Sequence, residues 1–450
     1  MSAAQGASAA SPPKKRRFGS GFAVLIALVL GVVIGGYFPQ DAHPTIFHLF
    51  QFISKAFLAL IKGLIVPLLI STIVVGVAQT GDLRAVGRMG AKALLWFETV
   101  TTLALFLGLG VANILKPGVG LPLDLGIKAT GVGPQPSGWD TALHLFPSNL
   151  AKHAAEGDIL PIVIFAVLLG VSLVRLGDRG KPVFAFFDSL AHAMFGYTDL
   201  IMKLTPVGVF GAMAQNTSHM AAGHLVNGEM LRGWSGVFWL LGRYAKLVGS
   251  LYFALFLLVL LVFVPTLLVL RISVLKFFRA FRDPIATAYA TASSESALPR
   301  LLERLVEFGV PNKVASFVVP AGYSFNLDGS TLYLCLASLT IAQASGVDMP
   351  LSRQVVMLLT FMLTSKGVAG VPRATLVIIA AACQSFDLPG EAGVAMILAV
   401  DEVMDMARSA VNVTGNAVAA IVVAKWEGNF LADGVTPDEV AGELPSADDR

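Results

Sequence analysis

The sequence predicts an all-α membrane protein with eight transmembrane helices and two re-entrant helical hairpins that form inverted repeats. The first observation is composition: of the 450 residues, 55% are hydrophobic and only 14% are charged, whereas a soluble chain is about 25% charged. The second is a set of uncharged runs, 18–40, 63–80 and 247–270, each close to the roughly 20 residues that cross a bilayer. The third is that small and polar residues interrupt the apolar pattern in the second half of the chain.

The first half of the chain alternates between loops with and without basic residues. Basic residues gather in the tail and in three loops, 1–17, 84–92, 175–181 and 271–282. The loops between them contain few: 40–54, 116–145 and 218–232. Because basic loops stay in the cytoplasm, the N-terminus and the end of the sixth span are predicted to be cytoplasmic. The six spans are expected at 21–39, 55–80, 93–115, 156–174, 184–217 and 235–270. The first apolar stretch is too long for a cleavable signal peptide.

The next apolar segments predict two hairpins that enter and leave the membrane on the same side. Residues 273–309 have basic residues at both ends and a small, polar centre at 291–296. Residues 350–386 have acidic residues at both ends and a glycine-rich centre at 367–372, so they are expected to enter from the opposite side. The helix between the hairpins is interrupted at 326–329. A hairpin and a helix therefore occur twice in opposite orientation, which is typical of secondary transporters.

The last apolar segment, 391–424, is predicted to be one helix with polar residues along one face. At about 100° per residue these residues fall within an arc of roughly 100°. They are Asp401, Asp405, Arg408, Ser409, Asn412 and Asn416. An ionised side chain inside a membrane costs roughly 2.5–3.5 kcal/mol or more, so this helix must direct its charges at partners, ions or a polar ligand. This face is the leading candidate for a solute-binding site, which favours transport.

The residue types on this face match a ligand that carries several charges. Arg408 can clamp a carboxylate with two parallel hydrogen bonds, and Asp405 on the same face can bind an ammonium group. Backbone amides at a broken helix or hairpin tip can bind an anion. Carbonyl oxygens beside Asn326 and Asp328 can bind a hard cation. Together these groups fit an amino acid that has a second carboxylate.

Four segments resemble the signatures of a known family. They are 293–299 (SSESALP), 325–330 (FNLDGS), 365–372 (SKGVAGVP) and 405–412 (DMARSAVN). In this order they resemble the dicarboxylate/amino acid:cation symporter family, which includes the glutamate transporters. The resemblance is strong over about 273–427, and the six spans of the first half are compatible with it. It implies a glutamate-transporter-like fold, a homotrimer and an elevator-type movement of a transport domain against a fixed scaffold.

The resemblance also implies a division of the chain. Residues 1–17 would form a cytoplasmic basic tail and 427–450 a disordered cytoplasmic tail. The scaffold would consist of helices 1–2 at 18–80 and helices 4–5 at 143–217. The transport domain would consist of helix 3 at 86–116 and of 234–426. The latter comprises helix 6, hairpin 1 at 273–309, helix 7 at 311–346, hairpin 2 at 350–386 and helix 8 at 391–426.

By the same resemblance, Arg408 would bind the distal carboxylate of the substrate and Asp405 its amino group. The main-chain groups of the substrate would be bound by Ser294, Val371, Ser409 and Asn412. Coupling cations would be bound at or near Asn326, Asp328 and Asp401, the candidate sodium ligands, with backbone atoms of Gly322 and Asn412. The tip of hairpin 2, which would act as a gate, would add the carbonyls of Ser365, Lys366 and Val368.

The identity of the coupling ion stays open between a proton and sodium. Sodium-coupled members usually have an aspartate where this chain has Asn416, and a neutral amide is a weaker sodium ligand. Glu98 in the third span and Glu295 at the first hairpin tip are expected to be buried carboxylates that can carry protons. We therefore favour proton coupling, although Glu98 can equally be a structural carboxylate paired inside the bundle. No other cofactor is expected.

The substrate class is predicted from Asp405. Members that transport C4-dicarboxylates lack an acidic residue at this place, because succinate and malate have no amino group. Asp405 therefore favours import of L-glutamate or L-aspartate, with a proton-coupled C4-dicarboxylate symporter as the alternative.

Other classes fit the sequence less well. A channel needs a continuous pore, and a membrane enzyme needs a nucleophile–base pair or a metal motif that the sequence does not contain. The net charge of +3 does not indicate a nucleic-acid partner. Lipid and a small acidic solute are the expected partners. Both termini are expected in the cytoplasm of a bacterium, with the chain in the inner membrane.

Overall fold

The computed structural model describes residues 20–63, 65–79, 83–123, 149–156, 159–226, 229–364, 374–428 and 430–431. Within these residues the chain is almost entirely helical, with one short antiparallel hairpin of β1 (His224–Val226) and β2 (Glu229–Leu231). Three helical stretches are long and apolar enough to cross a membrane: Met89–Leu115, Trp234–Val269 and Asp401–Trp426. The all-helical prediction is confirmed at this level. The number of membrane spans and the re-entrance of the hairpins stay predictions.

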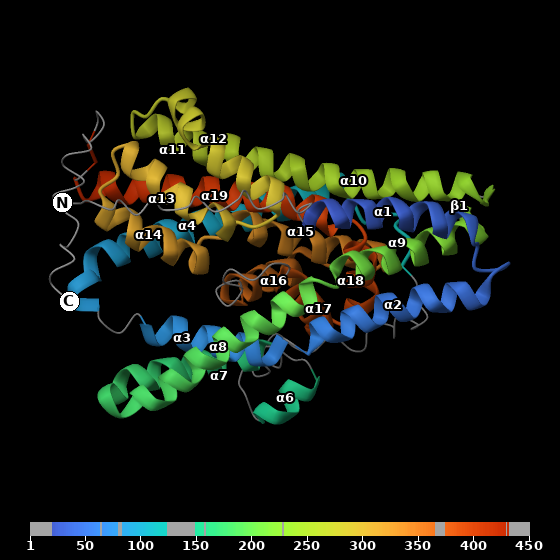
Figure 1. Cartoon of the computed structure of the whole chain (residues 1–450), viewed down its shortest axis with the longest axis horizontal. Coiled ribbons are helices and arrows are strands. Elements are labelled where there is room, and N and C mark those ends of the chain that lie inside the picture. The colour runs from blue at the N-terminus through green and yellow to red at the C-terminus, as the bar shows by residue number, and fades with distance from the viewer. Residues whose placement is uncertain are drawn as a thin grey trace, which may run out of the picture.

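The helices of the first half pack mainly against one another, except α4, which packs against α15 (Asp328–Ala344), α10 (Trp234–Leu258) and α19 (Asp401–Trp426) of the second half. They are α1 (Ser20–Tyr37), α2 (Pro44–Lys62), α3 (Ile65–Gln79), α4 (Leu83–Leu115), α6 (Leu150–Glu156), α7 (Ile159–Leu176), the 3₁₀ turn η1 (Gly177–Gly180), α8 (Lys181–Met202) and α9 (Thr205–Ala222). Helix α9 packs against α1 and α2, and α3 packs against α7 and α8. Figure 1 shows α3, α7 and α8 together along one side of the molecule.

Two of the predicted spans are wrong in extent. The span expected at 184–217 is two helices, because α8 ends at Met202 and Pro206 lies in the first turn of α9, where a proline starts a helix rather than continues one. The span expected at 55–80 is also two helices. The first, α2, starts at Pro44 in a segment that the sequence analysis assigned to a loop. Polar residues recur about every third position in its first half, and Lys55 ends the uncharged run before it reaches the roughly 20 residues of a spanning helix.

The second half begins with a long helix that contains a π-helical turn directly before a proline. It consists of α10 (Trp234–Leu258), the π-helical turn η2 (Val259–Phe263) and α11 (Val264–Val269). Pro265 cannot donate the hydrogen bond that would continue the α-helical ladder, and a wider turn precedes it. The first hairpin follows as α12 (Val274–Thr291), the turn η3 (Glu295–Ala297) and α13 (Leu298–Glu307). Ala292 closes α12 in a left-handed conformation at φ 47°.

The predicted interruption of helix 7 is confirmed. Helix α14 (Asn312–Phe325) ends where Asn326 and Leu327 leave the helical conformation at φ −130° and −94°, and α15 (Asp328–Ala344) starts directly after them. The arms of the second hairpin are α16 (Leu351–Thr364) and α17 (Ala374–Ser385). The tip between them, 365–373, lies outside the described residues. It includes Ser365, Lys366, Val368 and Val371.

The prediction of one continuous last helix is wrong. The segment divides into α18 (Gly390–Leu398) and α19 (Asp401–Trp426), because Val400 adopts φ −120° and ψ 2°. The break places Asp401 in the first turn of α19, where a carboxylate interacts favourably with the unpaired N–H groups of the helix start.

Helix α19 forms the centre of the molecule. In an apolar 18-residue stretch of α19, 89% of the residues are buried, against 44% in the stretch of α4 and 39% in that of α10 and α11. It packs against α4, α10, α12, α14 and α15, and Figure 1 shows it between α10 on one side and α14 and α4 on the other. A helix that is buried almost all round and still carries charged residues must satisfy them inside the protein.

The closest contact between α1 and α9 depends on Gly35. An added Cβ at this position would overlap the Thr217 hydroxyl and the Ala214 carbonyl of α9. Thr217 also donates to the Gly31 carbonyl of α1 at 3.1 Å. We expect G35V to destabilise the protein by about 1–3 kcal/mol, the usual cost of overpacking, and to lower the unfolding temperature in detergent. The matched control is G249A in α10, because an added Cβ there meets nothing within 4 Å. Equal unfolding temperatures for G35V and G249A would contradict the packing described here.

Candidate functional site

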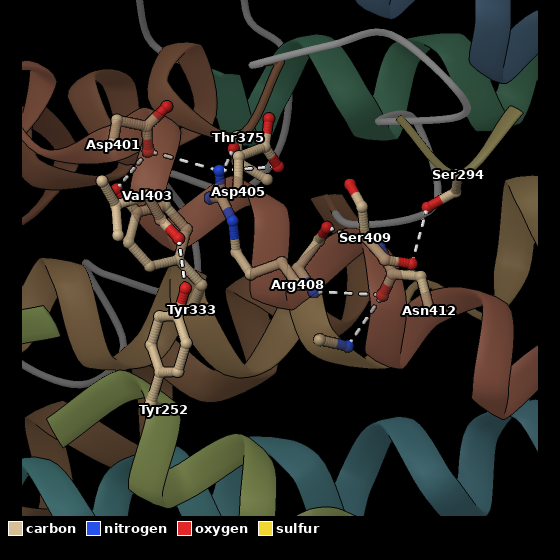
Figure 2. Close-up of polar contacts among 12 residues, drawn as sticks. Tyr252, Ser294, Tyr333, Thr375, Asp401, Val403, Asp405, Arg408, Ser409 and Asn412 are labelled. Carbon is tan, nitrogen blue, oxygen red and sulfur yellow. Dashed lines mark hydrogen bonds and ion pairs between the residues drawn. The ribbon is translucent and has the colours of Figure 1, made fainter. Parts of the chain in front are cut away.

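The centre of the candidate site is the guanidinium of Arg408 on α19. Its side chain is fully buried at 0% exposure, and Nη2 lies 2.8 Å from Oδ1 of Asp405 and 3.3 Å from Oδ1 of Asp401. Figure 2 shows both carboxylates beside the guanidinium. Residues three and seven positions apart lie on the same face of a helix, so α19 itself supplies both counter-charges. A buried arginine without such partners would be strongly destabilising.

Tyr333 of α15 holds this ion cluster from the other side. Its hydroxyl donates to Oδ1 of Asp401 at 2.8 Å, and the guanidinium carbon of Arg408 lies 3.9 Å from the centre of its ring. This cation–π geometry favours a desolvated guanidinium. The second oxygen of Asp401, Oδ2, is buried and has no hydrogen-bond partner in the described part of the chain. Asp401, predicted as a sodium ligand, has Arg408 and Tyr333 as its partners here.

Asn412, one turn beyond Arg408, holds the start of α15. Its Oδ1 accepts hydrogen bonds from the backbone N–H groups of Gly329 at 2.9 Å and Ser330 at 3.3 Å, and its Nδ2 donates to Oγ of Ser330 at 3.0 Å. These backbone groups have no partner within their own helix. Asn412 therefore acts as a cap supplied by a neighbouring helix. To bind a substrate with its side chain, as predicted, Asn412 would have to exchange these hydrogen bonds for bonds to the substrate.

The tip of the first hairpin contacts α19 directly beside Arg408. The hydroxyl of Ser294 donates to the Ser409 carbonyl at 3.3 Å, and Tyr323 of α14 donates to the Ser294 carbonyl at 2.8 Å. Figure 2 shows Ser294, Ser409 and Asn412 on one side of Arg408. The structure thus brings together four of the predicted substrate-binding residues around Arg408: Asp405, Ser409, Asn412 and Ser294.

A second polar cluster surrounds the break between α14 and α15. Asn326, Asp328 and Asn416 are each fully buried, and Nδ2 of Asn326 donates to Oδ1 of Asn416 at 3.0 Å. An added Cβ at Gly322 would overlap Oδ1 of Asn416, so the backbone of α14 lies directly against this amide. The predicted cation-binding set of Asn326, Asp328, Asn416 and Gly322 is therefore close together in space.

This second cluster has the oxygen donors that a hard cation needs. Oδ1 of Asn326 is buried and accepts no hydrogen bond from the residues that the structure describes. Thr101 of α4 donates to Oδ1 of Asp328 at 3.4 Å. A carboxylate, a hydroxyl and an unused amide oxygen fit a sodium-sized cation or a protonated water molecule better than an anion. Asn416 contributes a neutral oxygen where an aspartate would add a charge.

Neither of the two glutamates predicted as proton carriers is fully buried. Glu295 is exposed at the start of η3, so the expectation that it is a buried carboxylate is wrong. Glu295 is the first residue of the 3₁₀ turn η3, whose buried residue is Ala297. Glu98 is half-buried on α4, three residues before Thr101, and its two alternative roles both stay open. The predicted contributions of Val371, Ser365, Lys366 and Val368 fall in the hairpin tip outside the described residues.

Sequence reasoning missed four residues that the structure places in the two clusters. They are Thr101, Ser330, Tyr333 and Thr375. Thr375, at the start of α17, accepts a hydrogen bond from Nη1 of Arg408 at 3.1 Å. Ser330 and Tyr333 lie on α15 one turn apart, directly after the break at Asn326, and a search for polar residues near that break could have found them. Nothing in the local sequence marks Thr101 or Thr375.

The arrangement offers charged and polar groups to a ligand. It contains a guanidinium, carboxylates, amides and hydroxyls, and the described residues contain no group of three or more histidine, cysteine or acidic side chains positioned to hold a metal ion. Arg408 and Asp405 offer one positive and one negative group 2.8 Å apart. Asp405 is the more accessible of the two, with 12% of its side chain exposed against 0% for Arg408. A ligand of mixed charge could replace the internal ion pair.

Comparison with known proteins gives a family match over nearly the whole chain. The family model described as "Sodium:dicarboxylate symporter family" matches residues 21–426. The proton/sodium-glutamate symport protein of Bacillus subtilis (strain 168) is 39% identical over 426 residues, covering 93% of this chain and 95% of the relative. The proton/glutamate-aspartate symporter of Escherichia coli (strain K12) is 39% identical over 431 residues, with 93% and 95% covered. The C4-dicarboxylate transport protein of Laribacter hongkongensis (strain HLHK9) is 37% identical over 431 residues, with 94% and 92% covered.

The contribution of Tyr333 to the ion cluster can be separated into its ring and its hydroxyl. We expect Y333F to retain the ring against Arg408 but to lower the free energy of unfolding by about 1.5–3 kcal/mol, because a hydrogen bond to a buried charge is lost. Y333L should cost more, since it removes the ring as well. The measurement is thermal unfolding of purified protein in detergent. Y37F serves as the control, because Tyr37 is 66% exposed. If Y333F unfolds like the wild type, the hydroxyl does not support Asp401.

Proposed function

The chain belongs to the sodium:dicarboxylate symporter family, whose members are transporters rather than enzymes, and on that premise we propose that it is a secondary active symporter. Its substrates are acidic amino acids, L-glutamate and L-aspartate. Import is driven by a proton gradient, or by a sodium gradient, through an elevator-type movement. The observation that carries the proposal is the Arg408–Asp405 pair, held at 2.8 Å in a buried site.

The pair supports an acidic amino acid because each of its members has a counterpart on that ligand. The distal carboxylate of glutamate or aspartate would take N–H groups of Arg408, a bidentate arrangement that guanidinium groups favour. The ammonium group would take the carboxylate of Asp405. The ligand would exchange one internal ion pair for two with the protein, so neither Arg408 nor Asp405 is left without a counter-charge inside the site. Leaving either one unpaired would be costly.

The balance of buried charge supports coupling to a cation. The buried charged side chains of the described residues are one guanidinium, Arg408, and four carboxylates, Asp328, Asp401, Glu402 and Asp405. An acidic amino acid adds a further net negative charge. Because a negative charge added to a buried site needs compensation, binding of the substrate beside these carboxylates favours uptake of protons or sodium ions together with it. Asn416, in the cluster with Asn326 and Asp328, is neutral. This favours protons, because a sodium ion bound there would have one carboxylate ligand fewer than with an aspartate at position 416.

The alternative function is proton-coupled transport of C4-dicarboxylates. It is favoured by relatives with that name, one of them 37% identical to this chain. Arg408 serves a dicarboxylate as well as an acidic amino acid, so the two proposals differ at Asp405. A carboxylate there matches an ammonium group and repels a ligand that has only carboxylates. Because of this repulsion, we favour acidic amino acids over C4-dicarboxylates as substrates.

The remaining proposals concern location and assembly. The apolar helices support an integral multi-pass protein of the bacterial inner membrane with both termini in the cytoplasm. The family supports a homotrimer in which 18–80 and 143–217 form the scaffold. Helix 3 and residues 234–426 would move as the transport domain.

Separate gradients across proteoliposomes test the function and the coupling ion together. We expect radiolabelled L-glutamate to accumulate under an inward proton gradient without sodium. Strict dependence on sodium would retain the symporter and contradict proton coupling. Uptake of succinate without any uptake of glutamate or aspartate would favour the alternative.

N416D is the informative variant for the coupling ion. It adds a carboxylate beside Asn326 and Asp328, so we expect sodium to stimulate its uptake at least several-fold more than that of the wild type.

The role of Asp405 in substrate choice gives a separate prediction. We expect D405S to weaken L-glutamate binding about 10- to 100-fold, the equivalent of losing one charge-assisted hydrogen bond of about 1.5–3 kcal/mol. Succinate binding should not weaken, because the repelling carboxylate is gone. Both are measured by titration calorimetry. The control E307Q changes an exposed carboxylate of α13 that pairs with Arg304 and should leave both affinities unchanged. Parallel losses for glutamate and succinate in D405S would contradict an ammonium-binding role.

A further inference from the structure

Thr375 is a partner of Arg408 that comes from the second hairpin. It is the second residue of α17 and only 5% exposed, and its Oγ1 accepts a hydrogen bond from Nη1 of Arg408 at 3.1 Å. Figure 2 shows it beside the guanidinium with Asp401 and Asp405. The other described partners of the Arg408 side chain come from α15 and α19. This bond therefore connects an arm of the α16–α17 hairpin to the residue at the centre of the site.

The guanidinium keeps donors available in this arrangement. Asp401 and Asp405 both occupy Nη2, and Thr375 takes one N–H of Nη1. Nε is buried and has no hydrogen-bond partner within the described ranges. Since an arginine has five N–H groups, the described partners leave Nε and the second N–H of Nη1 unused, and either can donate to an incoming carboxylate. The atom that Thr375 contacts is thus one that such a carboxylate can use.

The chemistry of a hydroxyl differs from that of the two aspartates. A hydroxyl accepts a hydrogen bond and retains its own proton for donation. Thr375 therefore orients Nη1 without adding negative charge that would compete with the ligand. A carboxylate bound to Nη1 would have the hydroxyl proton within reach as an additional donor. A carboxamide offers only one oxygen acceptor and directs its own N–H donors at a neighbour, so it would match this set of donors less well.

We propose that Thr375 is a positioning and specificity-determining residue for the distal carboxylate of the substrate, an inference that rests on the proposed acidic amino acid as ligand. Its hydroxyl holds Nη1 of Arg408 in place and donates to the carboxylate when the ligand arrives. The ligand then contacts α19 through Arg408 and α17 through Thr375.

Two substitutions of the full-length protein separate the hydroxyl from the shape of the side chain. T375V has nearly the same shape without the hydroxyl, and T375S retains the hydroxyl without the methyl group. Binding of L-aspartate and L-asparagine is measured by titration calorimetry at constant pH and salt. We expect T375V to weaken L-aspartate binding about 10-fold or more and T375S by no more than about 3-fold. The affinity ratio of L-aspartate to L-asparagine should fall in T375V and not in T375S.

The control is T340V. Thr340 is a fully buried threonine of α15 whose hydroxyl donates within its own helix, to the Leu336 carbonyl at 2.7 Å. T340V should leave the affinity ratio unchanged. If T375V does not yield a monodisperse protein, T375A removes the same hydroxyl with less bulk and carries the same expectation.

Three results would overturn the inference. One is wild-type affinity in T375V. Another is a loss in T375S as large as that in T375V, which would assign the effect to packing. The third is an equal loss for L-aspartate and L-asparagine, since a structural role does not discriminate between them. A wild-type chain that binds no acidic amino acid would contradict the proposed function itself, and that failure appears before any variant is made.

Discussion

The buried guanidinium of Arg408 is the constraint on which the rest of the site depends. A fully buried cation is tolerated only if the protein surrounds it with counter-charges and hydrogen bonds. Asp401 and Asp405 supply the charges from the same helix, Tyr333 supplies a π face and a hydroxyl for Asp401, and Thr375 supplies a neutral acceptor. These partners come from α15, α17 and α19. The requirement to satisfy one side chain therefore fixes how three elements of the second half meet.

Two helix breaks put acidic residues at helix starts around the same centre. Asp328 begins α15 and Asp401 begins α19, where the unpaired N–H groups and the positive end of the helix dipole stabilise a negative charge. Asn412, on α19, accepts hydrogen bonds from the backbone N–H groups at the start of α15 that have no partner within that helix. Non-helical backbone inside a membrane is tolerated only where such partners exist or where it lines a cavity. The breaks are thus compatible with burial and also provide polar groups for solutes.

Close packing of α15 against α19 depends on two glycines, Gly329 at the start of α15 and Gly415 within α19. A Cβ at Gly329 would lie 2.8 Å from the Arg408 carbonyl, and one at Gly415 would lie 2.8 Å from Oδ2 of Asp328. Larger residues at either place would force α15 away from α19 and separate Asn412 from the N–H groups that it caps. The same spacing keeps Asn326 within hydrogen-bond distance of Asn416. The cluster around Arg408 and the second polar cluster around Asn326 and Asp328 are therefore adjacent parts of one packed unit.

The sequence by itself determined the helical class, the hairpin turn predicted at 291–296, the break predicted at 326–329 and the identity of the residues on the polar face. These follow from local chemistry: apolar run length, small polar turns and helical spacing. The tertiary structure alone decided which of those residues meet. It divided the last helix at Val400, exposed Glu295, and brought Thr101, Tyr333 and Thr375 to the site from other helices. Contacts between distant segments depend on the packing of whole helices, and the spacing of residues along one helix does not predict them.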